Sequence, residues 1–385
     1  MNKKVIVSSD AFLPKLGGGP VYVNNMVNHL SNYDFEILTK GTPYQKSLEV
    51  MAENLTVRRF TNNGFSNSPL LNSNKYLNFS GKIYKEIQFF RSQIKYLGDS
   101  SFDIFHFMGM PMNPQMHLLF KKLKIDFHSY FANFTFIKKP KVISFLNLPH
   151  DFSKDAIHAK FYNHYIEQFD NIICIDNHIY NYCEEYINQK NLNKKLYFIP
   201  VSVDTINFTI NQKNPESNFK IGFAGRLART ADLKMVNFLI ANLPSEIEFH
   251  LAVTGDLSKL ETPLNKKNIK VLIDTPHPYM SEFYKNIDVL FNPLLYQGVS
   301  FVTLEAMSCG CPVIMYKNAD RYLPNDSNGF TVEQDKEKIL NLIIKLSKDF
   351  DNIRQVSYEA AKKIREEYSH KILISKIEKV YKSII

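Results

Sequence analysis

Short runs of β-branched and aliphatic residues alternate with segments of helical periodicity over most of the chain, and this alternation limits the possible folds more than any other sequence feature. The first run, residues 4–8, is followed by apolar residues at the helical spacing i, i+3, i+4 and i+7, namely Val23, Met26, Val27 and Leu30. Repeated strand–helix units form parallel sheets with helices on both faces. We therefore predict an α/β protein.

The expected strands fall into two groups, separated by a polar, turn-rich stretch at 211–218. The first group is 4–8, 35–39, 103–107, 141–148, 171–175 and 195–199, with a helix near 80–97. The second group is 219–224, 248–253, 268–273, 288–292 and 312–315, and the pattern is helical from about 335 onwards. A chain of 385 residues is also longer than one average domain. We predict two doubly wound, Rossmann-like domains facing a cleft, 1–205 and 206–370, with a final helix at 371–385.

Composition excludes several classes of protein. Hydrophobic residues make up 44% of the chain and charged residues 22%, which fits neither a disordered chain nor a coiled coil. The four cysteines include no C-x-x-C pair, so we expect neither a disulfide framework nor a four-ligand zinc site. No apolar run approaches the roughly 18 residues of a membrane span, and the first strand follows directly after Met-Asn-Lys-Lys. We expect a cytoplasmic protein without a signal peptide.

The net charge of +9 lies mostly in the first 200 residues. Between 119 and 141, six lysines accompany a single acid, Asp126, and alternate with aromatic residues such as Phe131 and Phe136. A basic and aromatic surface is typical of proteins at anionic membranes and of nucleic-acid-binding proteins. We favour peripheral contact with the inner face of an anionic membrane over nucleic acid. The alternative is that this segment binds no partner, because its lysines are surface residues in contact with water and its phenylalanines pack in the core.

Gly17, Gly18 and Gly19 lie between the first expected strand and the first expected helix, and Pro20 suits the first helical turn. Glycines let backbone N–H groups approach a ligand, and a helix N-terminus favours phosphate. The loop is therefore either a phosphate contact or only a tight turn. Because it is not G-x-G-x-x-G, it does not predict a dinucleotide site.

Cations follow the first strand of the second group. The segment Gly225-Arg226-Leu227 ends this strand, and Lys234 lies near the start of the next helix. Two fixed cations at this position can neutralise a diphosphate without a metal. Arg229 competes for this role, and the alternative for all three cations is surface charge in water.

The segment 297–312 contains an expected helix that begins near Ser300 and ends at Gly310. Ser300 can cap this helix, and the N–H groups of its first turn can bind phosphate. Glu305 lies in the first turns of the helix, where a carboxylate can accept two hydrogen bonds from a ribose diol. The alternative for Glu305 is a helix charge exposed to water.

This segment resembles the nucleotide-sugar signature of GT-B glycosyltransferases, glycosyltransferase family 4 in particular. The residues that match the signature EG.G...LEAM.CG.PVI are Gly298, Leu304, Glu305, Ala306, Met307, Cys309, Gly310, Pro312, Val313 and Ile314. Other segments resemble family motifs in the same order along roughly 3–330: Pro14 with the 17–19 glycines, 103–106, 199–204, 225–227 and 288–293. The resemblance implies the GT-B fold, in which the last helix commonly packs on the first domain.

The resemblance also implies roles for individual residues. The family's nucleotide-sugar contacts fall on Gly18, Gly19, Gly225, Arg226, Lys234, Gln297, Gly298, Val299, Ser300, Phe301, Leu304 and Glu305. The implied catalytic residues are Arg226, Lys234, His150 and Gln297, and His150-Asp151 resembles the family's HD, whose histidine faces the donor sugar. Two positions depart from the family pattern. Gln297 replaces a glutamate, and Lys234 matches the family lysine only through a longer loop, since Ala231 stands at the usual spacing.

The implied activity is a retaining, metal-independent transfer from a nucleotide-diphosphate sugar, with UDP favoured, to a glycan or lipid-linked acceptor. Bacterial surface polysaccharide synthesis, such as that of lipopolysaccharide or capsule, is the implied process. No cofactor is expected, because the nucleotide-sugar is a substrate, and we interpret the D-x-D at 349–351 as a turn or helix cap and not as a metal site. Two alternatives stay open: a catalytically silent GT-B-like binding protein, suggested by Gln297, and another GT-B enzyme such as a nucleotide-sugar epimerase.

Overall fold

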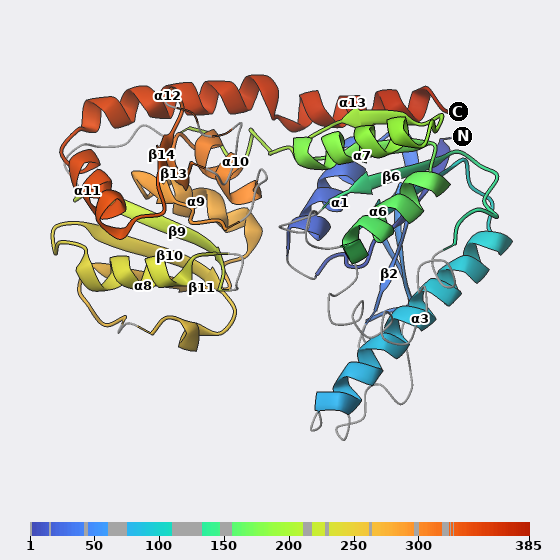
Figure 1. Ribbon diagram of the computed structural model, residues 1–385, viewed down its shortest axis with the longest axis horizontal. Helices are drawn as coiled ribbons and strands as arrows, with labels where there is room; N and C mark the ends of the chain where they lie inside the picture. Colours follow the sequence, from blue (N-terminus) through green and yellow to red (C-terminus); the bar gives the residue numbers. More distant parts are fainter. Residues whose placement is uncertain are drawn as a thin grey trace. The chain divides into compact units, whose positions relative to one another are not determined.

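The computed structural model describes residues 2–14, 17–41, 45–60, 75–109, 133–146, 156–210, 218–227, 231–261, 264–295, 300–317, 323, 325 and 327–385 (Figure 1). Contacts within the chain divide it into two compact units. Unit 1 comprises Met1–Ile199 and Ile374–Ile385, and unit 2 comprises Pro200–Leu373. For comparison, the domain limits expected from the sequence are 205 and 370.

Unit 1 is built on an eight-stranded sheet with the order β3-β4-β2-β1-β5-β6-β7-β8. Its strands are β1 (Lys3–Ser8), β2 (Tyr33–Lys40), β3 (Leu48–Ala52), β4 (Leu55–Phe60), β5 (Ile104–Gly109), β6 (Lys141–Phe145), β7 (Asn171–Cys174) and β8 (Lys195–Phe198). Its helices are α1 (Gly18–His29), α3 (Lys75–Asp99), α6 (Ala156–Gln168), α7 (Asn177–Gln189) and most of α13 (His370–Lys382). Neighbouring strands are parallel except for β3 with β4.

The hairpin of β3 and β4 was missed by the sequence analysis. In β4, Leu55 and Val57 are buried and alternate with partly exposed neighbours, which is the pattern of a half-buried strand. Arg59 interrupts this pattern because it is a charged residue at a buried position. Its guanidinium donates hydrogen bonds to the Glu49 carboxylate at 2.5 Å and to the Leu13 carbonyl at 2.9 Å. The ion pair with Glu49 in β3 therefore compensates for burying the charge of Arg59 at a position where the alternating pattern predicts an apolar residue.

Helices cover both faces of this sheet, as the alternating side chains of β5 show. Phe107 packs on one face, where its ring stacks on that of Tyr165 in α6 with 5.1 Å between the centroids. His106, the preceding residue, points to the other face and meets the ring of Tyr381 in α13. The last helix of the chain therefore packs on unit 1.

His106 is fully buried where it meets α13. Its Nδ1 lies 2.5 Å from the hydroxyl of Tyr381, and its Nε2 lies 2.8 Å from the Oγ of Ser144. Burial lowers the pKa of His106 to about 3, because a charged ring would lose its hydration without gaining a negative partner. The ring is therefore neutral at ordinary pH and holds the end of the chain through neutral hydrogen bonds.

Unit 2 contains a six-stranded, parallel sheet with the order β11-β10-β9-β12-β13-β14. Its strands are β9 (Lys220–Arg226), β10 (Glu248–Thr254), β11 (Ile269–Ile273), β12 (Val289–Phe291), β13 (Val313–Tyr316) and β14 (Phe330–Val332). Its helices are α8 (Leu233–Asn242), η2 (Leu257–Lys259), η3 (His277–Tyr279), α9 (Met280–Lys285), α10 (Phe301–Ser308), α11 (Lys336–Leu346) and α12 (Phe350–Glu367). All expected strands are present, with ends within three residues of the expected ones, whereas β14 was missed because three residues are too few for a periodic signal.

The strand order confirms the doubly wound α/β prediction and places a switch point in each sheet. β1 lies between β2 and β5, and β9 lies between β10 and β12. Ligands of such sheets bind outside the carboxyl ends of the strands, where the strand order reverses. Arg226 is the last residue of β9 and Asn292 directly follows β12, so both residues lie at this edge of the unit 2 sheet.

We expect Tyr381→Phe to lower the free energy of unfolding by about 1–3 kcal/mol, because Nδ1 of the buried His106 loses its hydrogen-bond partner. The matched control is Tyr358→Phe, at a tyrosine of α12 that is 62% exposed, and we expect its effect to stay within about 0.5 kcal/mol. Urea unfolding followed by circular dichroism measures both. Equal midpoints for the two variants would contradict the expectation.

Candidate functional site

Helix α10 begins directly after Ser300, as the sequence predicts. The Ser300 side chain accepts a hydrogen bond from the N–H of Thr303 at 3.1 Å and so caps the helix. Asn292, which follows β12, donates from its side chain to the hydroxyls of Ser300 and Thr303 at 3.2 and 2.9 Å. The N-terminus of α10 is thereby fixed at the carboxyl end of β12.

The other end of α10 is fixed as well. The N–H groups of Gly310 and Cys311 donate to the carbonyls of Met307 and Ala306 at 3.0 and 2.9 Å, which is the Schellman pattern of helix termination. Gly310 has a φ of +71°, and a Cβ atom there would lie 2.6 Å from Cγ1 of Ile210. Both the backbone conformation and the available space therefore require glycine.

Glu305 is buried, like its neighbours in α10 from Thr303 to Ser308, with only 3% of the residue exposed. Its Oε1 accepts a hydrogen bond from Nε2 of His277 at 2.7 Å, and its Oε2 accepts one from the hydroxyl of Tyr284 at 3.0 Å. A buried carboxylate needs such partners to compensate for its lost hydration. The alternative reading of Glu305, a helix charge exposed to water, is therefore wrong.

The two partners of Glu305 were missed by the sequence analysis. His277 in η3 and Tyr284 in α9 lie 28 and 21 residues before Glu305, and no motif that we used connects them to it. The ring of Phe208 packs against both, with 5.4 Å between centroids to His277 and 6.2 Å to Tyr284. We call these four residues, Phe208, His277, Tyr284 and Glu305, the Glu305 cluster.

The two partners of Glu305 respond differently to pH. Burial by itself lowers the pKa of His277, but the hydrogen bond to Glu305 and the negative charges of Glu305 and Asp204 outweigh it and raise this pKa above its usual value. Burial, together with the neighbouring Glu305, raises the pKa of Tyr284 well above its usual value. Tyr284 is therefore a hydroxyl donor throughout the physiological range, whereas His277 stays protonated to a higher pH than a free histidine.

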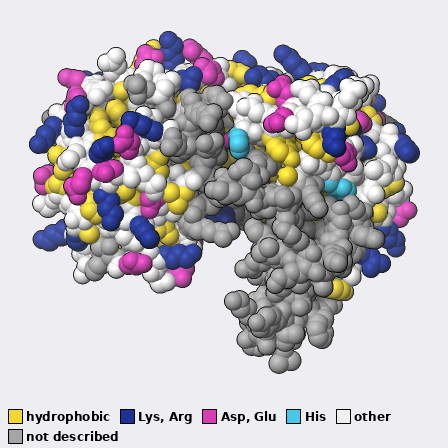
Figure 2. All heavy atoms as spheres, in the orientation of Figure 1, with side chains coloured by type: hydrophobic (Ala, Val, Ile, Leu, Met, Phe, Trp, Pro, Cys, Tyr) yellow, Lys and Arg dark blue, Asp and Glu magenta, His cyan; other side chains and the backbone are white. Residues whose placement is uncertain are grey.

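The predicted diphosphate cations lie at the same edge of the sheet. Gly225 and Arg226 end β9, and Gly225 has a φ of +148°, a conformation that favours glycine. The side chains of Arg226 and of Lys234, the second residue of α8, are exposed. Arg229 lies outside the described residues. Acidic and basic side chains are interspersed on the visible face of unit 2 (Figure 2), so surface charge alone does not distinguish Arg226 and Lys234 from other cations.

Asp232, a residue that the sequence analysis did not single out, fixes the start of α8. It caps the helix, and its carboxylate also accepts a hydrogen bond from the hydroxyl of Tyr316 in β13 at 3.0 Å. Its own N–H donates to the carbonyl of Pro293 at 2.8 Å, and the preceding residue forms a β-bridge with Leu294. These contacts bring the start of α8, with Lys234, to the segment that leads from β12 towards α10.

The remaining predicted donor-site residues lie in several places. Gly18 and Gly19 begin α1 in unit 1. Phe301 and Leu304 belong to α10, where Leu304 is fully buried. The predicted residues that lie outside the described ones are His150, Gln297, Gly298 and Val299.

The basic and aromatic segment is described only from residue 133 onwards. Phe134 is fully buried, whereas Phe136 is 41% exposed and the neighbouring Lys138 and Lys139 are exposed. The segment thus combines core and surface aromatic residues, and membrane contact stays a prediction. Among the helices that the structure describes, none is long and apolar enough to cross a membrane.

The D-x-D sequence is confirmed as a helix cap. The side chain of Asp349 accepts a hydrogen bond from the N–H of Asn352 at the start of α12, at 3.3 Å. Within the described ranges, no group of three or more His, Cys, Asp or Glu side chains is arranged to hold a metal ion. Independence of a metal stays a prediction.

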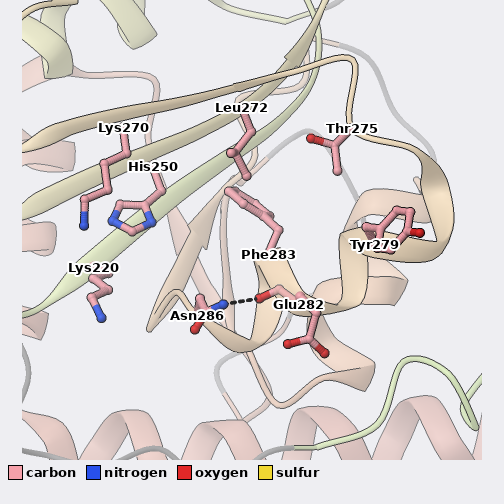
Figure 3. A pocket seen from close by; sticks show the side chains of 9 residues that line it. All are labelled: Lys220, His250, Lys270, Leu272, Thr275, Tyr279, Glu282, Phe283 and Asn286. Carbon is pink, nitrogen blue, oxygen red and sulfur yellow. Dashed lines mark hydrogen bonds between the residues drawn. The ribbon is translucent and has the colours of Figure 1, made fainter.

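A pocket of about 420 Å³ lies along the edge strand β11 and helix α9 (Figure 3). Lys220, His250 and Lys270 lie together at one end of it, Leu272 and Phe283 lie near the middle, and Thr275 and Tyr279 lie at the other end. The nearby Glu248 carboxylate accepts hydrogen bonds from both His250 and Lys270 at 2.8 Å, which offsets the positive charge. No residue of the predicted donor site is among its described lining residues.

Comparison with known proteins points to glycosyltransferases. Residues 218–349 match the family described as Glycosyl transferases group 1. Over 99% of its length the chain is 23% identical to an uncharacterized glycosyltransferase of Methanocaldococcus jannaschii, 98% of which is covered. Over residues 218–349 the chain is thus similar to the group 1 glycosyltransferases, and over its full length to one curated glycosyltransferase. The matched range of this glycosyltransferase includes Arg226, Lys234 and the whole of α10, together with His277 and Tyr284.

Solved structures share the fold over the full length. Sucrose-phosphate synthase of Thermosynechococcus elongatus superposes with a TM-score of 0.74 at 13% identity, and 99% of each chain is covered. Anabaena HepE in complex with UDP-glucose superposes with a TM-score of 0.66 at 14% identity, covering 99% of this chain and all of HepE. At these identities the similarity establishes the GT-B fold alone, which confirms the fold that the sequence resemblance implies.

We expect Gly310→Ala to destabilise this glycosyltransferase by about 1–3 kcal/mol, because alanine is strained at positive φ and its Cβ meets Ile210. Gly98→Ala in α3 is the matched control, since a Cβ there has no atom within 4 Å, and it should leave stability unchanged or raise it by up to about 1 kcal/mol. Thermal unfolding of the two variants measures the difference. A Gly310→Ala protein as stable as the control would show that the α10 terminus tolerates a side chain.

Proposed function

We propose that this glycosyltransferase is a retaining enzyme that moves a sugar from a UDP-sugar to a hydroxyl of a glycan or lipid-linked acceptor. The observation that carries the proposal is Glu305, a buried carboxylate held by two hydrogen bonds on the helix that begins at the carboxyl end of β12. Each carboxylate oxygen accepts more than one hydrogen bond, so Glu305 can also accept the two hydroxyls of a ribose. The complex of the structural relative HepE with UDP-glucose supports uridine as the base.

Arg226 and Lys234 are proposed to neutralise the diphosphate of the donor. Both side chains are exposed, one at the carboxyl end of β9 and the other in the first turn of α8. Cations aimed at a leaving diphosphate stabilise the charge that develops on it and need no metal to do so. Through the family resemblance, we further assign Gly18, Gly19 and 297–301 to the nucleotide-sugar and His150 to the donor sugar.

In the proposed reaction, the bond between the anomeric carbon and the diphosphate oxygen breaks while the acceptor oxygen bonds to the same face of that carbon. The departing diphosphate oxygen takes the proton of the acceptor hydroxyl, so the step needs no side-chain nucleophile. The protein then contributes orientation of the two substrates and stabilisation of the negative charge.

We propose that the acceptor is an intermediate of bacterial surface polysaccharide synthesis, such as that of lipopolysaccharide or capsule. The reaction would take place at the inner face of the cell membrane. The support is the basic and aromatic segment at 119–141, of which Phe136, Lys138 and Lys139 are exposed. Aromatic rings can lie at the headgroup level, and lysines are attracted to anionic lipids.

A thermal-shift panel of UDP-, GDP-, ADP- and CMP-sugars, each with and without EDTA, tests the donor class. We expect a UDP-sugar to raise the melting temperature, since a ligand at 100 times its Kd adds about 2.7 kcal/mol, and we expect EDTA to leave the shift unchanged. Turnover with an acceptor, followed by determination of the product anomer, then tests retention. A shift by another nucleotide only would overturn uridine, and binding without turnover on any acceptor would favour a catalytically silent protein.

We expect Glu305→Gln to weaken binding of the responding UDP-sugar by about 10- to 150-fold, because a hydrogen bond to a charged group is worth about 1.5–3 kcal/mol. Glu366→Gln, at an exposed position of α12, is the matched control and should bind like the wild type. Isothermal titration calorimetry gives both affinities, and the melting temperatures show that each variant is folded. Unchanged affinity of a folded Glu305→Gln variant would remove Glu305 from the nucleotide site.

A further inference from the structure

A histidine is hydrogen-bonded to the carboxylate that is proposed to bind the ribose. Nε2 of His277 is 2.7 Å from Oε1 of Glu305, and the other carboxylate oxygen, Oε2, is 3.0 Å from the hydroxyl of Tyr284. The Glu305 side chain is 4% exposed, whereas that of His277 is 35% exposed. Protons can therefore reach the histidine from solvent although the carboxylate itself is enclosed.

We propose that His277 is a positioning residue that orients the Glu305 carboxylate for the donor ribose and, when protonated, cancels its charge, so that donor affinity falls as the pH rises. This inference rests on the proposed function, since it assigns to Glu305 the role of ribose contact. Two features separate His277 from a merely structural partner. Tyr284 already supplies Glu305 with a neutral hydrogen bond, and histidine is the side chain whose usual pKa lies closest to neutral pH.

The surroundings of His277 contain several groups that act on its charge. On α10 the neighbour is the Glu305 carboxylate, and on α9 it is the neutral hydroxyl of Tyr284. In the segment before β9, the ring of Phe208 packs against His277, and the negative charge of Asp204 acts on it. Burial by itself raises the pKa of Asp204. The hydrogen bonds from the N–H groups of Asn207 and Ile206 and from the Asn207 side chain, together with the charge of nearby His370, outweigh burial and lower this pKa.

The direction of the pH effect follows from these charges. Two carboxylates raise the pKa of His277 although burial opposes them, so the ring is protonated up to a higher pH than a free histidine. Below that raised pKa the His277–Glu305 pair has no net charge. Above it, a neutral ring still donates from Nε2, but the pair carries a negative charge close to the site of an anionic donor. Affinity for the donor therefore decreases as the pH passes through the raised pKa.

The test compares the full-length wild type with His277→Gln, because glutamine can donate a hydrogen bond to Glu305 but cannot become charged. The exposed His29 of α1 supplies the matched control, His29→Gln. UDP-glucose is the probe, since its diphosphate stays fully ionised between pH 5.5 and 9, and calorimetry without added metal gives its Kd across that range. For one unit charge at about 10 Å in a partly aqueous site, the effect is on the order of three- to tenfold in Kd.

We expect the Kd of the wild type and of His29→Gln to rise about three- to tenfold from pH 5.5 to 9. The Kd of His277→Gln should stay flat and close to the high-pH value of the wild type. An equally steep rise in His277→Gln would assign the pH effect to another group and overturn the inference. A flat wild-type profile with measurable binding would overturn it too, while leaving the proposed donor intact.

A second measurement separates positioning from simple stabilisation. Because its folded-state pKa is raised, His277 stabilises the fold fully below its unfolded pKa, and this contribution is lost as the pH rises through the folded pKa. The melting temperature of the wild type, relative to His277→Gln, should therefore be highest near pH 5.5. If this stability difference appears without any pH dependence of UDP-glucose binding, His277 supports the fold only. Absence of UDP-glucose binding to the wild type at every pH would instead overturn the proposed function, and the inference with it.

Discussion

The candidate site depends on how a single carboxylate is kept in the interior of unit 2. Glu305 is almost completely buried, and a charged group in that position is tolerated only when hydrogen bonds replace its lost water. The replacement comes from His277 and Tyr284, which belong to the connection between β11 and β12. The same two hydrogen bonds also fix the direction of the carboxylate, which is the property that a ribose contact requires.

Helix α10, which carries this carboxylate, is anchored at both ends. Asn292 and the Ser300 cap fix its beginning beside β12, and the positive φ of Gly310 ends it where Ile210 leaves no room for a side chain. Asp232 ties the start of α8 to the same edge of the sheet. The switch point of the sheet, the helix ends and the predicted cations thus converge on one edge, as is common for nucleotide sites in doubly wound folds.

Two histidines of this glycosyltransferase show how the surroundings decide the charge of one residue type. His106 is fully buried between Ser144 and Tyr381, with no acid among its hydrogen-bond partners, and its pKa falls to about 3. His277 is partly buried beside Glu305 and within the field of Asp204, and its pKa rises. The first histidine is therefore a neutral packing residue that holds the last helix to unit 1. The second can carry a charge where an anionic ligand is proposed to bind.

The α/β class, most of the strands, the cap at Ser300, the terminus at Gly310 and the resemblance to group 1 glycosyltransferases could all be predicted from the sequence, because these depend on local periodicity, backbone conformation and contiguous motifs. The sequence did not reveal the burial of Glu305 or its partners, and it missed Arg59 in β4 because an ion pair with Glu49 replaces the expected apolar residue. The meeting of His106 with Tyr381, 275 residues apart, was equally out of reach. These contacts became visible in the folded protein alone, since the cost of burying a polar group depends on neighbours that folding brings together from distant parts of the chain.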